Sequence, residues 1–167
     1  MIERYTRKEL KNIWTEENKY KIWLNIELAA AEGMEKYNII PKGIAKKVRA
    51  KAKIDVKKIL KIEESVKHDV IAFLTSITNR VGKDAKYLHK GMTSSDVLDT
   101  CFNIQLKQSG LILLSDISTL ISTIRKQAIK HKRTLCIGRS HGIHAEPITF
   151  GLKLATYYEE FKRNKKR

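Results

Sequence analysis

The stretch DVLDTCFNIQLKQSGLILLSDISTLISTIRKQAIK, residues 96–130, decides the fold of this chain. It contains no proline, and its only glycine is Gly110. Apolar residues recur at steps of three and four, at Val97, Cys101 and Ile104 and then at Leu114, Ile117, Ile121, Ile124 and Ala128. This spacing is typical of the seam of a packed helical bundle. At ~1.5 Å per residue, the helix would be a rod of about 50 Å, which needs long partners to bury its seam.

Shorter helices are predicted before this rod, because residues that favour helix ends punctuate the first part of the chain. Thr6 with Glu9 fits a capping box, and Thr15 and Asp55 are each expected to cap the helix that follows. A further helix is expected from about Asp69, and it ends at Gly82.

We therefore predict an all-α fold, with a compact helical N-terminal domain at residues 1–92 and the beginning of a long-helix bundle at residues 93–167. Only one more helix is expected after residue 147, with apolar residues at Phe150, Leu154, Tyr158 and Phe161. One short partner cannot bury the seam of the rod. The sequence thus indicates a fragment of a longer protein, or a chain that buries its seam against other chains.

Composition narrows the class of protein. The chain has 167 residues, of which 42% are hydrophobic and 31% charged, as in an ordinary soluble domain. Charges run through the first thirty residues, and the richest apolar run, Leu111 to Leu114, is too short to cross a bilayer. The two cysteines, Cys101 and Cys136, have neither a metal-type nor a redox-type spacing, and Cys101 falls in register with apolar positions. We predict a soluble cytoplasmic protein in which Cys101 is a packing residue, and no membrane association.

The formal net charge of +16 has two interpretations. A basic surface attracts nucleic acid, and it also steers anionic substrates. The lysines are spread from Lys8 to Lys166, without an Arg-rich motif or an aromatic stacking platform, whereas a specific nucleic-acid binder concentrates its charge on one element. Diffuse charge is favoured and no specific nucleic-acid partner is expected, with a basic helical nucleic-acid-binding module kept as the alternative from another class.

Four polar clusters lie at helix starts or breaks: ERYT (3–6), KHD (67–69), HKGMTSSD (89–96) and GRSHGIHAEP (138–147). In the third, Ser94 or Ser95 is expected to cap the long helix, whose free N–H groups and dipole favour an anion. Thr93 and Ser94 add hydroxyl donors for a carboxylate or phosphate. Plain N-capping is the competing interpretation.

The other clusters also have two interpretations each. Lys67, His68 and Asp69 are either a solvated helix start or contacts to an anionic substrate. His141 and His144 belong to a site, are buried and hydrogen-bonded, or hold zinc; no cysteine or carboxylate constellation completes a zinc site, so no metal is predicted. Gly138 and Gly142 would let the backbone approach a ligand closely. The spacing alone leaves the site and the buried histidine open.

Three stretches decide between these interpretations. KHDVIAF, HKGMTSSDVLDT and GRSHGIHAEPITFG together resemble the adenylosuccinate lyase family of the aspartase/fumarase superfamily, and the resemblance runs from ERYT to the last residue. It implies β-elimination of fumarate from adenylosuccinate, which gives AMP, and from the succinyl-carboxamide ribonucleotide SAICAR, which gives AICAR, in purine biosynthesis. It also implies a homotetramer on a long helical bundle, active sites formed from several subunits, and no metal or organic cofactor.

The resemblance assigns a role to each matching residue. His141 is the general acid that protonates the leaving nitrogen, and His68 is a second catalytic histidine that assists or orients it. The implied substrate contacts are Arg4 and Tyr5 near the phosphate, Lys67, Asp69, the active-site histidine His89, Thr93 and Ser94 at the succinyl part, and Ser140 beside His141. Family members often have threonine at the position of Ser140, which keeps the hydroxyl. For His144 only a structural role is implied.

The resemblance places the general base on a mobile serine loop well beyond residue 167, and nothing in this sequence is similar to that loop. These 167 residues alone are therefore expected to be inactive. Argininosuccinate lyase and fumarase, which share the bundle, are the alternatives within the superfamily. ERYT together with KHDV favours the purine enzyme, because these are its nucleotide-side residues.

Overall fold

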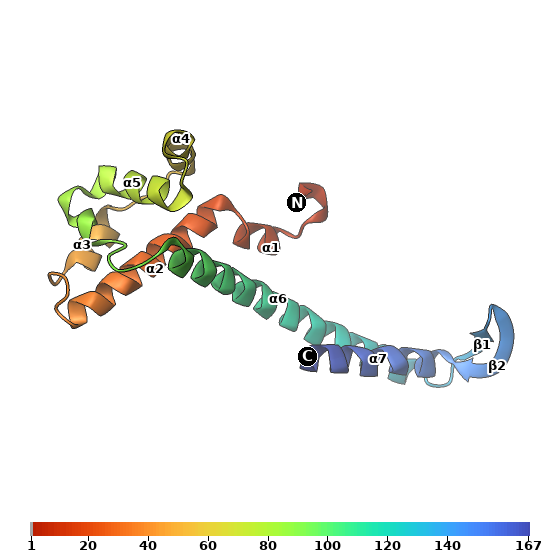
Figure 1. Ribbon diagram of the computed structural model, residues 1–167. Coiled ribbons are helices and arrows are strands. Elements are labelled where there is room, and N and C mark those ends of the chain that lie inside the picture. The colour runs from red at the N-terminus through yellow and green to blue at the C-terminus, as the bar shows by residue number, and fades with distance from the viewer. Residues whose placement is uncertain (1) are drawn as a thin grey trace. The chain divides into compact units, whose positions relative to one another are not determined.

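The computed structural model describes residues 2–167 and is shown in Figure 1. The helices are α1 (Lys8–Ile13), α2 (Glu16–Lys36), α3 (Ile44–Lys51), α4 (Val56–Val66), α5 (Asp69–Val81), α6 (Ser94–Lys130) and α7 (Phe150–Lys166), with short 3-10 helices at Glu3–Tyr5 and Lys83–Tyr87. Strands β1 (Leu135–Ser140) and β2 (Ile143–Thr149) form the sheet. The predicted helical fold is confirmed.

The chain divides into two compact units, the first ending at Ser109 and the second running from Gly110 to Arg167. The domain boundary expected at residues 92 and 93 stays a prediction.

Local capping explains most of the helix starts in the first unit. The Thr15 hydroxyl accepts from the backbone N–H of Asn18 at 3.2 Å, and the Asp55 carboxylate accepts from that of Lys58 at 3.1 Å, as the sequence predicts. The capping box expected at Thr6 is wrong. The Thr6 hydroxyl donates to the carbonyl of Ile2 at 3.0 Å instead, and α1 begins after Arg7 without a side-chain cap.

An aromatic cluster forms the centre of the first unit. Tyr20 and Trp23 from α2 and Phe73 from α5 have ring centroids 5.1 to 5.9 Å apart, and all three side chains are buried. Val97 and Cys101 of α6 lie in the same core. The first turns of the long helix therefore pack as part of the N-terminal core. Burial raises the pKa of Tyr20 to about 12, with the nearby carboxylates of Glu16, Glu63 and Asp69 adding to the shift.

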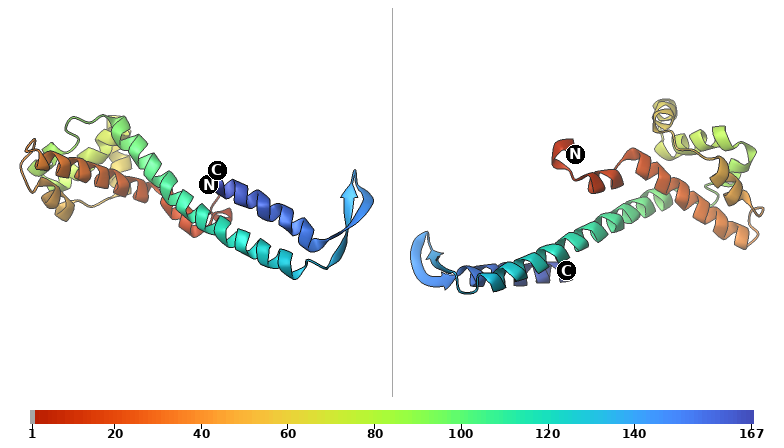
Figure 2. Two further views of the ribbon diagram at one scale, coloured as in Figure 1. Left: turned by 90° about the horizontal axis from the view of Figure 1, so that it is seen from below. Right: turned by 180° about the vertical axis from the view of Figure 1, so that it is seen from behind.

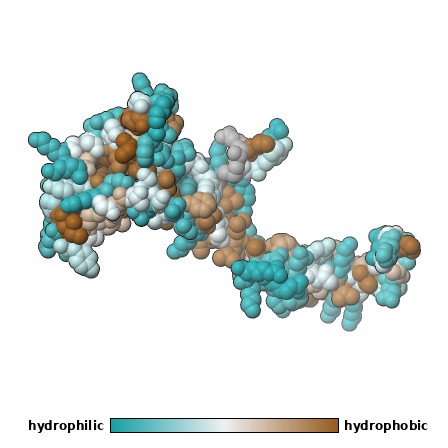
Figure 3. All heavy atoms as spheres, viewed as in Figure 1, coloured by the Kyte–Doolittle hydropathy of each residue, from teal (hydrophilic) through white to brown (hydrophobic). Residues whose placement is uncertain are grey.

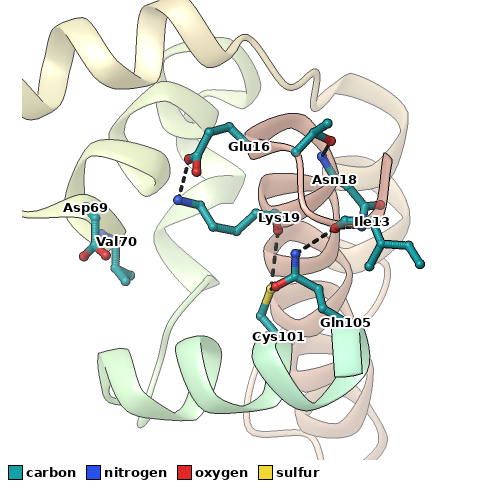
Figure 4. A network of polar contacts seen from close by, with 9 residues as sticks. Ile13, Glu16, Asn18, Lys19, Asp69, Val70, Cys101 and Gln105 are labelled. Carbon is teal, nitrogen blue, oxygen red and sulfur yellow. Dashed lines mark hydrogen bonds and ion pairs between the residues drawn. The ribbon is translucent and has the colours of Figure 1, made fainter. Parts of the chain in front are cut away.

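Polar contacts fix α6 against the turn between α1 and α2 (Figure 4). The Gln105 amide donates to the carbonyl of Ile13 at 2.8 Å, and the Cys101 thiol donates to that of Lys19 at 3.8 Å. The indole N–H of Trp14 donates to the Ser109 hydroxyl at 3.1 Å. Burial also raises the pKa of the Cys101 thiol. Cys101 is a buried packing residue, as its register with apolar positions predicts.

The second unit holds the rest of α6, the β1–β2 hairpin and α7, which runs back alongside the second half of α6 (Figures 1 and 2). Large apolar side chains remain exposed along α6, and some are visible in Figure 3. They are Phe102, Leu106, Leu111, Leu113, Leu114, Leu120 and Ile129. Along the seam, Val97 and Cys101 are buried, and Leu114 is exposed. The other seam residues are half-buried within this chain: Ile104, Ile117, Ile121, Ile124 and Ala128. No helix in the described part of the chain is long and apolar enough to span a membrane.

The polar cluster at residues 138–147, which the sequence analysis places at a break between helices, lies in a β-hairpin. Its strands are antiparallel, with Ser140 opposite Ile143 and Leu135 opposite Thr149. His141 and Gly142 form the two-residue turn, with φ of 53° and 76°. Two successive positive φ angles are what a type I′ hairpin turn needs, and glycine is favoured at its second position. The sequence prediction missed the strands because each is short and an alternating apolar pattern is weak in them.

Helices α6 and α7 approach closely at Gly151. Its backbone N–H donates to the carbonyl of His131 at 3.0 Å, while the N–H of Phe150 donates to that of Thr134 at 2.8 Å. A Cβ atom on Gly151 would lie 2.5 Å from the carbonyl oxygen of Ala128 and 2.7 Å from backbone atoms of Lys132. Because these neighbours are backbone atoms, they cannot rotate away as a side chain does.

Replacing Gly151 with alanine is therefore expected to lower the free energy of unfolding by about 1–3 kcal/mol, the usual cost of overpacking. Urea unfolding followed by circular dichroism measures the change. Gly110→Ala is the matched control, since nothing beyond its own turns of helix lies within 4 Å of a Cβ at that position. The control should be neutral or stabilising by about 0.5–1 kcal/mol. Equal destabilisation by both variants would contradict the close approach at Gly151.

Candidate active site

Left-handed backbone marks three of the predicted site residues. Among residues 2–167, the non-glycine residues with positive φ are Asn38, Lys67, His89 and His141. This conformation is uncommon outside glycine and costs of order 1–3 kcal/mol, and such residues cluster at functional sites. The observation does not depend on any resemblance, and it supports Lys67, His89 and His141 as site candidates.

The KHD cluster forms the junction between α4 and α5. Lys67 ends α4, with its backbone N–H on the carbonyl of Glu63 at 2.8 Å, and His68 is the N-cap of α5. The His68 Nδ1 accepts from the backbone N–H of Ile71 at 3.5 Å, a long contact that holds the ring only weakly. The Asp69 carboxylate accepts from the N–H of Val70 at 2.7 Å. The helix-start interpretation is correct for the backbone.

The same cluster keeps its side chains accessible. The His68 and Asp69 side chains are 47% and 40% exposed and lie 3.5 Å apart, from Nδ1 to Oδ1, and Lys67 is exposed. An imidazole and a carboxylate are thus offered side by side, and the exposed Lys67 precedes them in the sequence. This arrangement suits an anionic ligand that also carries hydrogen-bond donors, so capping and substrate contact do not exclude each other here.

His89 has a partner that the sequence analysis missed. The Glu27 carboxylate on α2 accepts from the backbone N–H of His89 at 2.7 Å, and its other oxygen lies 2.7 Å from the His89 Nδ1. The Glu27 side chain is fully buried, whereas that of His89 is 18% exposed. One signal was available in the sequence: Glu27 interrupts the apolar stripe of Trp23, Leu28 and Ala31 with an acidic residue.

The start of α6 is capped differently from the prediction. The Asp96 carboxylate accepts from the backbone N–H of Thr93 at 2.8 Å, and the N–H of Asp96 donates to the Thr93 carbonyl at 3.1 Å. Ser94 and Ser95 already lie inside the helix, so the expected serine cap is wrong: the longer aspartate side chain reaches back to Thr93 instead. In the part of the chain that the structure describes, the Thr93 and Ser94 hydroxyls make no hydrogen bond, which leaves both as donors for a ligand.

Arg4 and Tyr5 lie together near the N-terminus. The Arg4 guanidinium stands 4.8 Å from the centre of the Tyr5 ring, and both residues are exposed. A cation over an aromatic face is attracted by the ring, which gives the guanidinium a preferred position. This pair can meet an anionic group such as a phosphate from solvent.

Ser140 and His141 are presented by the tip of the hairpin, and His144 lies opposite Arg139 in β2. His141 and His144 are exposed within this chain, which does not favour the buried-histidine interpretation for either. The Gly138 backbone approaches its own partner strand, where a Cβ would lie 2.9 Å from the carbonyl of Glu146. Its lack of a side chain therefore serves the hairpin rather than the approach of a ligand.

The predicted site residues form separate groups. The groups at Arg4, at Lys67 and at His89 with Thr93 and Ser94 belong to the first unit, and Ser140 with His141 belongs to the second. No hydrogen bond or ion pair between described residues joins one group to another. Each group is open to solvent, so the chain presents parts of a site rather than an enclosed pocket.

The fold matches solved structures of two enzymes. It superposes on a fumarate lyase from Mesorhizobium sp. BNC1 with a TM-score of 0.90 and 24% identity, covering 98% of this chain and 40% of that one. It superposes on β-carboxy-cis,cis-muconate cycloisomerase from Acinetobacter calcoaceticus with a TM-score of 0.89 and 25% identity, covering 96% of this chain and 39% of that one. These likenesses concern the fold.

The sequence profile of the lyase family matches residues 2–167, and the chain belongs to this family. Relatives that match 98% or all of this chain are adenylosuccinate lyases. That of Streptococcus mutans is 47% identical over 164 residues, 98% of this chain and 38% of the enzyme, and that of Bacillus subtilis is 46% identical over 167 residues, 100% of this chain and 39% of the enzyme. The chain thus spans about two-fifths of the length of these relatives. The resemblance stated from the sequence motifs is confirmed.

Proposed function

We propose that this chain is the N-terminal part of an adenylosuccinate lyase, which eliminates fumarate from adenylosuccinate to give AMP and from SAICAR to give AICAR. The observation that carries the proposal is the 46–48% identity, across the whole chain, to several enzymes of that one activity.

The chemistry of elimination explains the residue types. Removing a proton next to a carboxylate builds negative charge, which preorganised donors and cations stabilise as it develops. Lys67 supplies a cation, the Thr93 and Ser94 hydroxyls supply donors, and the first N–H groups of α6 add the positive end of a helix dipole. The departing nitrogen needs a proton. His141 is the proposed acid, since histidine titrates near neutral pH and the hairpin turn presents its ring to solvent.

Further subunits are part of the proposal. The site groups are exposed and divided between the two units, and apolar residues from Leu106 to Ile129 remain open along α6. Exposed apolar stripes of this kind are typical of surfaces that meet other chains. We propose a homotetramer in which several copies complete each active site, in the cytoplasm, with small anionic substrates as the ligands.

Turnover assays of the full-length protein test the proposed function. Adenylosuccinate should yield AMP and fumarate, and SAICAR should yield AICAR and fumarate. Argininosuccinate and malate are the control substrates, because the related lyases act on them. Cleavage of argininosuccinate or dehydration of malate, without cleavage of adenylosuccinate, would assign the protein to another member of the superfamily. Salt-dependent binding of nucleic acid to one face without any turnover would favour the basic binding module.

The Thr93 and Ser94 hydroxyls give a further prediction. Thr93→Ala and Ser94→Ala are each expected to weaken fumarate binding about 10- to 100-fold, because a hydrogen bond to a charged group contributes ~1.5–3 kcal/mol. Their melting temperatures should change little, since neither hydroxyl is bonded within the described residues. Asp96→Asn is the matched control. It weakens the cap at Thr93 and should cost ~1 kcal/mol of stability while fumarate affinity is largely kept. Normal fumarate binding by both alanine variants would show that Thr93 and Ser94 have only a structural role.

A further inference from the structure

Glu27 is a fully buried carboxylate that makes two hydrogen bonds within the described residues, both with His89. One oxygen accepts from the His89 backbone N–H and the other lies 2.7 Å from its Nδ1. Burying a carboxylate is costly unless hydrogen bonds replace the lost water, and an apolar residue would fill this core position without that cost. Because Glu27 satisfies its two oxygens on a single predicted site residue, its charge serves His89 rather than the core.

The two contacts hold different parts of His89. The bond to the backbone N–H holds a residue whose φ is 58°, in the left-handed region that non-glycine residues rarely adopt. The bond to Nδ1 holds the ring. A buried helical residue thus fixes both the strained turn that carries His89 and the direction of its imidazole, across 62 positions of sequence.

The chemistry of the pair decides which ring atom remains for a ligand. An ionised carboxylate only accepts hydrogen bonds, so with Glu27 charged the Nδ1 of His89 carries the hydrogen and donates it to Glu27. This holds for a neutral ring and for an imidazolium. Nε2 is then the one ring nitrogen left for another partner, and 18% of the His89 side chain remains exposed. Orientation of a working histidine through its other nitrogen is a general device in protein sites.

We propose that Glu27 is a positioning residue, which fixes the tautomer and direction of His89 so that its Nε2 atom meets the substrate. The inference rests on the proposed function in one respect, that His89 belongs to the active site. Glu27 itself touches no substrate, because its side chain has no exposed surface. Its effect on turnover therefore passes through His89.

The first experiment reads the ring directly and needs no turnover. In protein labelled with 15N-histidine, at a pH where the rings are neutral, His89 should carry its hydrogen on Nδ1. Glu27→Gln replaces one acceptor oxygen with an N–H₂ donor, which favours hydrogen on Nε2 instead. Addition of AMP or fumarate to the wild type should shift the Nε2 signal. A wild-type ring with hydrogen on Nε2 would overturn the inference whatever the substrate of the enzyme. In a wild type that cleaves adenylosuccinate, an Nε2 signal that neither compound moves would overturn it as well.

The second experiment is a double-mutant cycle on kcat/KM in the active full-length protein. Glu27→Gln alone should lower kcat/KM about 10- to 100-fold, the usual cost of losing an orienting partner. In a His89→Ala background the same change should have almost no further effect, because the two residues act as one unit. Equal losses in both backgrounds would show that Glu27 acts through the fold and would overturn the inference. Failure of the wild type to cleave adenylosuccinate would refute the proposed function instead.

Two matched substitutions at position 89 test the proposal even if the Glu27→Gln variant does not fold. The amide nitrogen of asparagine stands where Nδ1 does, and that of glutamine stands near Nε2. His89→Asn should therefore keep the bond to Glu27 and the melting temperature but lose as much turnover as His89→Ala. His89→Gln should keep more turnover than His89→Asn. The reverse order would show that Nδ1 is the working atom and that Glu27 does not position the ring.

Discussion

Replacing His141 is expected to lower the rate of fumarate release by about 10²- to 10⁴-fold, the usual contribution of a general acid. The leaving nitrogen departs as an anion unless it is protonated, and His141 offers an imidazole at the exposed hairpin turn. Turnover of adenylosuccinate by the full-length protein measures the loss. His141→Asn is the most informative variant. Asparagine before glycine is favoured in the same left-handed turn, so the hairpin is kept while the acid is removed.

Two controls separate chemistry from hairpin geometry. His144→Ala removes an exposed histidine three residues away, in β2 opposite Arg139, and should lower the rate much less. His141→Ala keeps no side chain that favours a left-handed φ, and it should lose at least as much activity as His141→Asn. Wild-type turnover by folded His141→Asn would remove His141 from the mechanism. An equal loss in His144→Ala would show that the acid had been assigned to the wrong histidine.

Phe73→Ala is expected to lower the free energy of unfolding by about 3–5 kcal/mol, because it removes the ring that packs against both Tyr20 and Trp23. Phe73 has no exposed surface, so the variant leaves a cavity in a core that α2, α5 and α6 share. The loss is a large fraction of the stability of an ordinary domain. Urea unfolding followed by tryptophan fluorescence reports it, since Trp23 lies in the same cluster.

Ile71→Ala provides the control for this prediction. Ile71 lies two residues away on the same helix, with 45% of its surface exposed, and its truncation should change stability by less than about 1 kcal/mol. Phe73→Ala should also lower turnover near the melting temperature of the variant, because unfolding of α5 displaces Asp69, which begins the helix, and His68, which caps it. Well below that temperature, turnover should be almost unchanged. Similar losses in both variants would mean that the aromatic cluster does not hold the first unit together.

The sequence predicted those parts of the candidate site that a local pattern of residues marks. The clusters at Lys67, Thr93 and His141 interrupt helical patterns with polar residues, glycines and caps, and the motifs that contain them carry the family resemblance. What the sequence could not supply was the partner of each residue. The cap on α6 comes from Asp96 rather than from a serine, because the longer side chain reaches the Thr93 N–H that the serines inside the helix do not reach.

The sequence by itself determined the helices. The spacing of apolar residues and the absence of proline specify α6, and Thr15 and Asp55 start α2 and α4, because hydrogen bonds within three or four residues set helix and cap geometry.

Only the tertiary structure decided the contact of Gln105 with Ile13 across 92 positions and the pairing of Glu27 with His89 across 62. These features depend on which surfaces are buried together. Burial brings together residues that are far apart along the chain, and a local sequence pattern does not indicate which distant residues will be in contact.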